Sequence, residues 1–239
     1  MQDNPLKGIL LMNVAMFLLA GMDGISKTLA ADYAVPQILS VRFLIFCLFA
    51  LAIARPRSLR AAFRSKHPYL QIARSLIITI EVGVFILAFR YLPLADTHAI
   101  AGIAPLLVTA LAVPFLGEKV GMRRWTAIGI GFLGLLIIVR PGIGVFNPAA
   151  LIALAGAVLW SVYQILVRKV SDDDAATSLL YMAVIGAVVM TALAPFFWKP
   201  PDTTGWLLLL SLGVVGSLGH YILILAFRAA PASTLQPFH

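Results

Sequence analysis

Two long apolar runs, residues 95–116 and 125–139, are separated by a short charged link at residues 117–124. Each run approaches the length that a helix needs to cross the hydrocarbon core of a membrane, and the two together contain very few charged residues. Such runs are hard to place in the core of a soluble protein and easy to place in lipid. We therefore predict a hairpin of two transmembrane helices. The link carries three cations, Lys119, Arg123 and Arg124, which indicate the membrane face on which it lies.

The rest of the chain has the same character. Hydrophobic residues make up 61% of it and charged residues only 12%, whereas about a quarter of a soluble domain is charged. The sequence therefore predicts an all-α, polytopic membrane protein. The net charge of +8 comes from cations in short loops between apolar runs, which is typical of membrane topology signals and does not indicate a nucleic-acid partner. The single cysteine, Cys47, lies inside an apolar run and cannot form an intrachain disulfide.

We predict eight complete transmembrane helices and the start of a ninth. The first apolar run is longer than the core of a signal peptide and further spans follow it, so we expect a retained helix. Pro, Gly and Asp are frequent between the runs, as expected of turns. The predicted helices are Leu6–Ala30, Val35–Ala54, Leu70–Tyr91, Ala95–Leu116, Trp125–Val139, Pro148–Val167, Ala175–Phe197 and Trp206–Ala226.

The cations of the loops orient these helices. Loops on one side hold twelve Lys or Arg residues, and loops on the other side hold three, so the first side and the N-terminus are predicted to be cytoplasmic. The twelve are Lys7, Arg55, Arg57, Arg60, Arg64, Lys66, Lys119, Arg123, Arg124, Arg168, Lys169 and Arg228; the three are Arg90, Arg140 and Lys199.

A short internal repeat predicts how the helices are organised. The segment 88–90, Ala-Phe-Arg, is followed by Pro93, and the same three residues at 226–228 are followed by Pro231. Five predicted helices separate the copies, and an odd number inverts the second copy relative to the first. We predict two inverted five-helix halves, residues 1–142 and 143–239, with a substrate site between them. Because the repeat calls for two helices after Pro231, the chain is expected to be truncated at its C-terminus.

Five charged residues fall inside the predicted spans: Asp23, Lys27, Arg42, Arg74 and Glu81. An ionised side chain at the bilayer centre costs roughly 2.5–3.5 kcal/mol on insertion scales, so each of them is a candidate for function. Lys27 and Arg74 lie about one turn from a helix end, and we expect both to extend toward the interface.

The other three charges lie deeper. Asp23 and Arg42 are each about 10 Å from the external end of their helices, and we predict that they face each other or share a polar cavity. Such a pair can be functional or purely structural. Glu81 is near the middle of its helix, and burial without a fixed partner favours protonation of a carboxylate near neutral pH. Glu81 is therefore a candidate for proton coupling or substrate contact, with a structural hydrogen bond as the alternative.

Polar and aromatic residues of the second half can complete a substrate site. The predicted members are Trp160, Tyr163, Gln164, His220, Tyr221 and Gln236. Trp160 lies at mid-depth and can stack on a planar ligand, although core packing is the common role of such a residue. His98, near the outer end of its helix, is expected to be a wet interfacial residue.

Two motifs that suggest other chemistry have simpler explanations. Residues 129–134 fit the G-x-G-x-x-G dinucleotide pattern but lie inside a predicted span, where small residues serve close helix packing. Glu118 follows Gly117 beside cations, and we interpret it as a local cap or ion pair. The chain has no metal-binding or hydrolase motif, so we expect no catalytic residue, no cofactor and no enzymatic activity.

The hairpin resembles the drug/metabolite transporter superfamily, in particular its EamA-type carriers. The resemblance rests on the external link with Pro93, the Gly117-Glu118 pair, Trp125 at the start of the next helix, and the glycine-rich helix that ends in Arg-Pro-Gly at 140–142. It implies ten helices in two inverted halves, a central cavity and alternating access.

Three further segments are similar to bacterial S-adenosylmethionine carriers, and riboflavin carriers are also similar: Arg42-Phe43, the run 72–76 and the run 146–148. The resulting hypothesis is a secondary transporter of a small metabolite in the bacterial inner membrane, with protons as a candidate coupling ion. The alternative is a non-transporting membrane protein, which would be a degenerate fragment, a membrane-embedded enzyme or an assembly partner.

Overall fold

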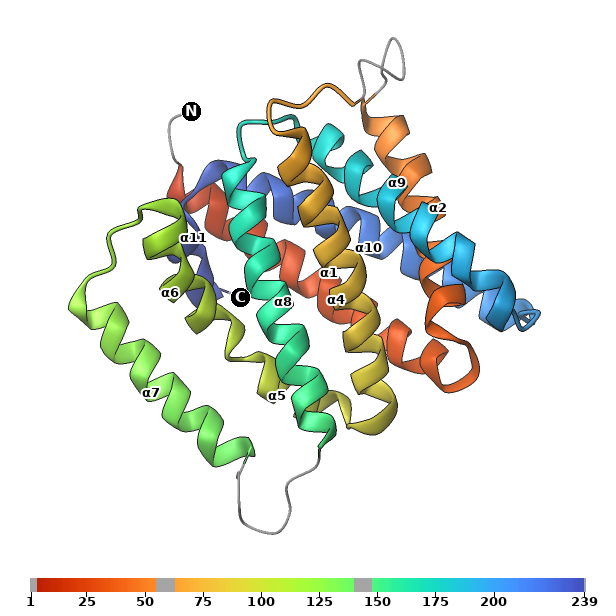
Figure 1. Ribbon diagram of the computed structural model, residues 1–239, viewed down its shortest axis with the longest axis horizontal. Helices are drawn as coiled ribbons and strands as arrows, with labels where there is room; N and C mark the ends of the chain where they lie inside the picture. Colours follow the sequence, from red (N-terminus) through yellow and green to blue (C-terminus); the bar gives the residue numbers. More distant parts are fainter. Residues whose placement is uncertain (1–3, 55–62, 140–147, 239) are drawn as a thin grey trace.

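The computed structural model describes residues 4–54, 63–139 and 148–238, and within these ranges the regular structure is entirely helical. Figure 1 shows the helices gathered into one bundle, with α7 at its periphery. The helices are α1 (Pro5–Asp32), α2 (Val35–Ala54), α4 (Pro68–Tyr91), α5 (Leu94–Ala101), α6 (Ala104–Leu116), α7 (Met122–Val139), α8 (Ala149–Lys169), α9 (Ala175–Leu193), η1 (Ala194–Phe197), α10 (Thr203–Ala229), α11 (Ala232–Leu235) and η2 (Gln236–Phe238).

The described helices confirm a polytopic membrane protein. Seven helical segments in the described ranges are long and apolar enough to cross a membrane. The fifth predicted span, Trp125–Val139, corresponds to α7, and its crossing of the membrane stays a prediction. The predicted helix Ala95–Leu116 is interrupted: α5 ends at Ala101 and α6 begins at Ala104.

Local signals in the sequence account for several helix ends. The Asn4 side chain accepts a hydrogen bond from the Lys7 amide at the start of α1, and Asp174 accepts from two amides at the start of α9. Gly117 ends α6 with φ 68°, a left-handed conformation in which glycine carries no steric penalty. The glycine of the Gly117-Glu118 pair is therefore the residue that ends α6.

The bundle is apolar outside and partly polar inside, the reverse of a soluble protein. Phe17 and Ile130 expose most of their surface, while Arg42, Gln71 and Gln164 are fully buried. In lipid, exposed apolar side chains carry no penalty, and buried polar groups favour the bundle interior.

Three helix pairs form the framework of the bundle: α1 packs against α10, α2 against α9, and α4 against α8. Further packing joins α2 to α10 and α4 to α9. Glycines permit these close approaches, because a Cβ atom at Gly186 would meet the Phe43 ring at 2.6 Å and one at Gly213 would meet Ile45 at 2.4 Å.

An acidic residue between α8 and α9 fastens the segment that leads into α4. The Asp173 carboxylate accepts hydrogen bonds from the Ser65 hydroxyl, the Lys66 amide at 2.8 Å and the Gln71 side chain at 2.9 Å. Nearby, Asp172 lies 3.2 Å from the Lys66 ammonium. These contacts hold together segments that are about a hundred residues apart in sequence.

Glu118 has a similar role at the same predicted face. Its two carboxylate oxygens each accept a hydrogen bond, at 3.0 Å, from the amides of Ala232 and Ser233 at the start of α11. Glu118 does cap a helix, as predicted, but the helix is α11, more than a hundred residues away in sequence, and not a neighbouring one.

Several predicted features fall outside the described residues. They are the loop cations Arg55, Arg57, Arg60 and Arg140, the predicted boundary between residues 142 and 143, and Phe146-Asn147.

Candidate functional site: a cavity inside the bundle

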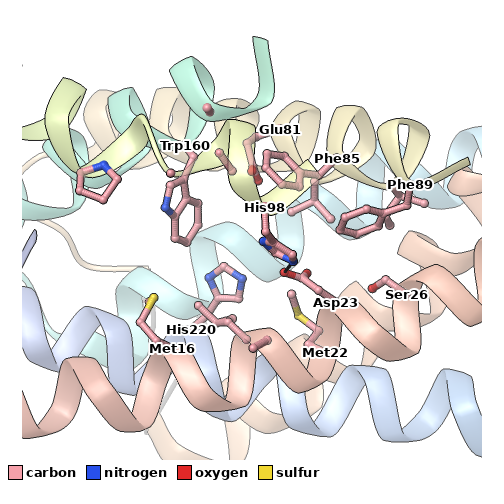
Figure 2. A pocket seen from close by; sticks show the side chains of 18 residues that line it. Met16, Met22, Asp23, Ser26, Glu81, Phe85, Phe89, His98, Trp160 and His220 are labelled. Carbon is pink, nitrogen blue, oxygen red and sulfur yellow. Dashed lines mark ion pairs between the residues drawn. The ribbon is translucent and has the colours of Figure 1, made fainter. Parts of the chain in front are cut away.

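A cavity of about 410 Å³ lies among α1, α4, α5, α8 and α10. Figure 2 shows side chains from these helices converging on it, with Asp23 from one wall and Glu81 and Trp160 from the opposite wall. Its charged and aromatic lining residues include Asp23, Glu81, Phe85, His98, Trp160 and His220. A cavity of this volume has the size of a small-molecule site.

Asp23 meets a histidine at the edge of the cavity. His98 Nε2 lies 3.5 Å from an Asp23 carboxylate oxygen, and the contact joins α1 to α5 (Figure 2). The expected direct pair of Asp23 with Arg42 is absent from the described residues, although the two charges are within electrostatic range. Arg42 is instead hydrogen-bonded to His220, which shares the cavity with Asp23.

Glu81 is the most enclosed carboxylate of the cavity. It is buried in α4 and lies within electrostatic range of Asp23 and Arg42. Among the described residues, neither a hydrogen bond nor an ion pair at bonding distance fixes its side chain. Glu81, Phe85 and Phe89 are spaced four residues apart, so one face of α4 presents all three to the cavity.

Aromatic rings form the inner end of the cavity. The Trp160 ring is stacked on Tyr163, with centroids 5.4 Å apart and planes at 26°, and its centroid is 6.2 Å from that of His220. Trp160 and His220 line the cavity, whereas Tyr163 lies behind them and is fully buried.

Two buried arginines lie next to these rings. The Arg42 guanidinium is over the rings of Phe43 and Phe46, and its Nη2 is 3.0 Å from His220 Nε2. The Arg74 guanidinium is 5.6 Å from the centre of the Tyr163 ring and donates to the Ser178 carbonyl. The expectation that Arg74 extends to the interface is wrong: its side chain points between α4, α8 and α9 and is fully buried.

Comparison with known proteins identifies the family. The sequence profile of the EamA-like transporter family matches residues 6–140, which is more than half of the chain. The chain belongs to the EamA-like transporter family.

Curated relatives of this family member are named as transporters. It is 28% identical to a riboflavin transporter of Vibrio cholerae over 99% of this chain and 81% of the relative. It is 29% identical to an S-adenosylmethionine uptake transporter of Rickettsia bellii over 73% of this chain, a match that spans 60% of the relative. A pseudopaline exporter of Pseudomonas aeruginosa is 26% identical over 95% of this chain and 80% of the relative.

The fold of this EamA-like transporter also has a counterpart among solved structures. A crystal structure with 20% sequence identity superposes with a TM-score of 0.70 and covers 96% of this chain and 84% of the other. At this identity the likeness concerns the fold alone.

The remaining predicted site residues lie away from the cavity lining. Gln164 in α8 accepts a hydrogen bond of 2.8 Å from the Gln236 side chain, and both are buried. Tyr221 packs edge-on against Phe49, with ring centroids 6.2 Å apart. Of the nine predicted residues, Asp23, Glu81, Trp160 and His220 line the cavity, and the others surround it or pack beside it.

Sequence reasoning missed several cavity residues of this EamA-like transporter. His98 was expected at a wet interface; it is partly exposed, but it also contacts Asp23. Phe85 and Phe89 were not among the predicted site residues, but both line the cavity. Their positions four and eight residues after Glu81 could have indicated this, because residues at that spacing lie on the same face of α4 as the carboxylate.

Within the described residues no group of three metal-ligating side chains is close enough to hold a metal ion. The G-x-G-x-x-G run lies in the interior of α7, so it cannot form a dinucleotide-binding turn. Of its three glycines, Gly131 makes a close approach, where a Cβ atom would meet Leu106 at 2.6 Å.

Proposed function

We propose that this protein is a secondary transporter that moves a small metabolite across the bacterial inner membrane through the cavity by alternating access. The observation that carries the proposal is Glu81, a buried carboxylate facing a cavity inside a lipid-exposed bundle without a fixed partner among the described residues. A costly charge in such a position marks a substrate or ion pathway by default.

Helix packing supports the proposal of two related halves. Suppose that α1 corresponds to α8, α2 to α9 and α4 to α10. Exchanging the two halves then converts the α1–α10 pair into the α8–α4 pair, and it leaves the α2–α9 pair unchanged. The same exchange turns α2–α10 into α4–α9. This exchange of packing pairs is expected of two repeats related by a two-fold axis.

The backbone at the two copies of the short repeat supports the same proposal. Leu92, which ends α4, and Ala230, which ends α10, are both extended, and each donates its amide to the alanine four residues earlier. Pro93 has φ −55° and ψ 149°, and Pro231 has φ −59° and ψ 147°. We therefore propose that residues 1–142 and 143–239 are inverted repeats.

The charge bias of the loops orients the proposed transporter. With the N-terminus in the cytoplasm, Asp23 and His98 lie toward the external end of the cavity, and the Asp173 and Glu118 contacts lie at the cytoplasmic face. In this arrangement the cytoplasmic end of the bundle is fastened by hydrogen bonds between segments distant in sequence.

Aromatic lining favours a flat substrate. Phe85, Phe89, Trp160 and two histidines surround the carboxylates, and such rings bind planar ring systems by stacking. The names of relatives as riboflavin and S-adenosylmethionine transporters agree with this class, because both molecules carry a planar heterocycle. We propose a heterocyclic metabolite as the substrate and Glu81, beside Asp23, as the group that takes up a coupling proton.

Uptake into proteoliposomes tests the proposal. The wild type is expected to accumulate labelled riboflavin or S-adenosylmethionine above empty liposomes, and Glu81→Gln to abolish the accumulation. Asp96→Asn, an exposed acid on α5 outside the cavity lining, is the matched control and is expected to behave as the wild type. If wild type and Glu81→Gln are both no better than empty liposomes across a panel of heterocyclic metabolites, the protein is not a carrier of this class.

A further inference from the structure

The inner end of the cavity contains an unusual excess of hydrogen-bond donors. Arg42, Arg74 and His220 are buried almost completely. The Arg74 guanidinium is 5.6 Å from the centre of the Tyr163 ring, the centroids of Tyr163 and His220 are 6.2 Å apart, and Arg42 Nη2 is 3.0 Å from His220 Nε2. We refer to Arg42, Arg74 and His220 as the donor cluster.

Most unpartnered polar atoms of the described interior belong to this cluster. Eight buried side-chain nitrogen or oxygen atoms have no hydrogen-bond partner among the described residues, and five of them are Nε and Nη1 of Arg42, Nε and Nη1 of Arg74, and Nδ1 of His220. Arginine can only donate, so His220 Nε2 accepts from Arg42 Nη2 and the proton of the neutral ring lies on Nδ1. All five atoms are therefore donors.

The described part of the chain places no close counter-charge beside the donor cluster. Within the described residues no carboxylate is within ion-pair distance of either guanidinium. Asp23 and Glu81 interact with Arg42 only at longer range. Asp173, the carboxylate that interacts electrostatically with Arg74, already accepts hydrogen bonds from three other donors. A buried cation with unbonded N–H groups is costly. A bound anion would neutralise the charge and accept hydrogen bonds from those N–H groups.

The donor cluster adjoins the cavity through His220. His220 belongs to the cavity lining and to the cluster, and its ring is next to Trp160 at the inner end. A ligand whose ring lies against Trp160 is therefore next to His220, whose Nε2 is 3.0 Å from Arg42 Nη2. Neither arginine has surface at the outside of the bundle, so a lipid headgroup does not contact them, and an anion reaches them only from the cavity side, past His220.

We propose that the donor cluster is an anion subsite that binds a carboxylate or phosphate group, and that the transported metabolite carries such a group. The inference deepens the proposed function by adding a charge requirement to the heterocyclic substrate. Two sources share this chemistry: a free inorganic or organic anion, and the charged end of the metabolite itself.

Equilibrium binding to the purified protein in lipid nanodiscs tests the subsite. Calorimetric titration at constant ionic strength with inorganic phosphate and with acetate is expected to give saturable binding, while acetamide, the neutral analogue of acetate, gives none. Arg42→Lys and Arg74→Lys keep the charge but lose the forked donor geometry, so each is expected to weaken binding about tenfold or more. Lys7→Gln, which removes an exposed cation, is expected to leave binding unchanged.

If the wild type binds neither phosphate nor acetate, the proposed subsite is wrong. It is also wrong if both arginine variants bind these anions with the same affinity as the wild type. The wild-type comparison of acetate with acetamide stays decisive if a variant fails to fold.

A second arm separates the two sources. If the subsite serves the metabolite, riboflavin 5′-phosphate binds about tenfold or more tightly than riboflavin, and inorganic phosphate competes with it. Equal affinities of the two flavins overturn the charge requirement. Because equilibrium binding needs no transport, failure of uptake leaves this result standing, and failure of anion binding leaves the transport proposal standing.

Discussion

Asp173 and Glu81 are both enclosed carboxylates, but their surroundings differ in kind. Asp173, between α8 and α9, accepts hydrogen bonds from a hydroxyl, an amide and a side-chain amide. Burial raises the pKa of Asp173, but these hydrogen bonds more than offset burial and hold the pKa below its ordinary value. Glu81 faces the cavity with no hydrogen bond among the described residues.

The comparison distinguishes Asp173, a carboxylate with a structural role, from Glu81, a carboxylate free to bind a proton or a ligand. A carboxylate whose lone pairs are occupied contributes to stability and cannot change partner without loss. A carboxylate that faces a cavity contributes little to stability, and is free to bind a proton or a ligand. Substitutions at the two positions should therefore have opposite consequences, which makes the comparison testable.

The largest loss of stability is expected from Asp173→Ala. Its removal leaves the Gln71 amide and two further donors without their acceptor, which lowers the free energy of unfolding by about 2–3 kcal/mol. Denaturation midpoints of the protein in detergent measure the change. Asp174→Ala, which removes only a helix cap, is the neighbouring control and is expected to cost less. A loss for Asp173→Ala no greater than that for Asp174→Ala would remove the distinction.

Acidification should remove part of the same contribution. Because the folded-state pKa of Asp173 is below the ordinary value of 3.8, its stabilisation is fully present above that value and is lost as the pH falls through the folded pKa. Stability measured between neutral pH and this acidic range should fall less steeply in Asp173→Asn than in the wild type. Identical profiles would contradict the assignment.

The Glu118 contact should have an intermediate effect. Glu118→Gln keeps an acceptor for one of the two amides of α11 and loses the charge, so we expect about 1 kcal/mol lower stability. Hydrogen exchange at Ala232 and Ser233 should become faster, while exchange in the central helices stays unchanged. Unaltered exchange at both amides would show that the cap contributes nothing.

The smallest effect on stability is expected from Glu81→Gln. Replacement of a buried, unfixed carboxyl group by a neutral amide should leave the free energy of unfolding unchanged or raise it by up to about 1 kcal/mol, while uptake is lost. The denaturation midpoint and the uptake rate, measured on the same preparation, give both values. A large loss of stability would place Glu81 in the same class as Asp173.

Helix positions followed from the sequence because bilayer thickness fixes the length of an apolar span. The prediction of α2 agrees at both ends, and α8 and α10 differ by a few residues. The interruption at residues 102–103 was not predicted, although Pro105, which lacks an amide to bond the preceding turn, was the available signal.

Charge partners were harder to predict because they depend on which helices become neighbours. The sequence predicts similar depths for Asp23 and Arg42, but α1 packs chiefly against α10, Asp23 meets His98 and Arg42 meets His220. Arg74 shows the same limit. Its position near a helix end favoured the interface, but the packing of α4 against α8 and α9 turns its side chain inward.

The interruption between α5 and α6 has a mechanical consequence. α5 is a separate helix of eight residues that carries His98, and it packs against α8 as α6 does. The Gly102 amide keeps the regular bond to the His98 carbonyl, whereas the Ile103 amide bonds to Ile100, three residues earlier, and Pro105 has no amide to donate. Tilting α5 about residues 103–105 therefore disrupts fewer backbone hydrogen bonds than bending an intact helix, and such a tilt would displace His98 at the rim of the cavity.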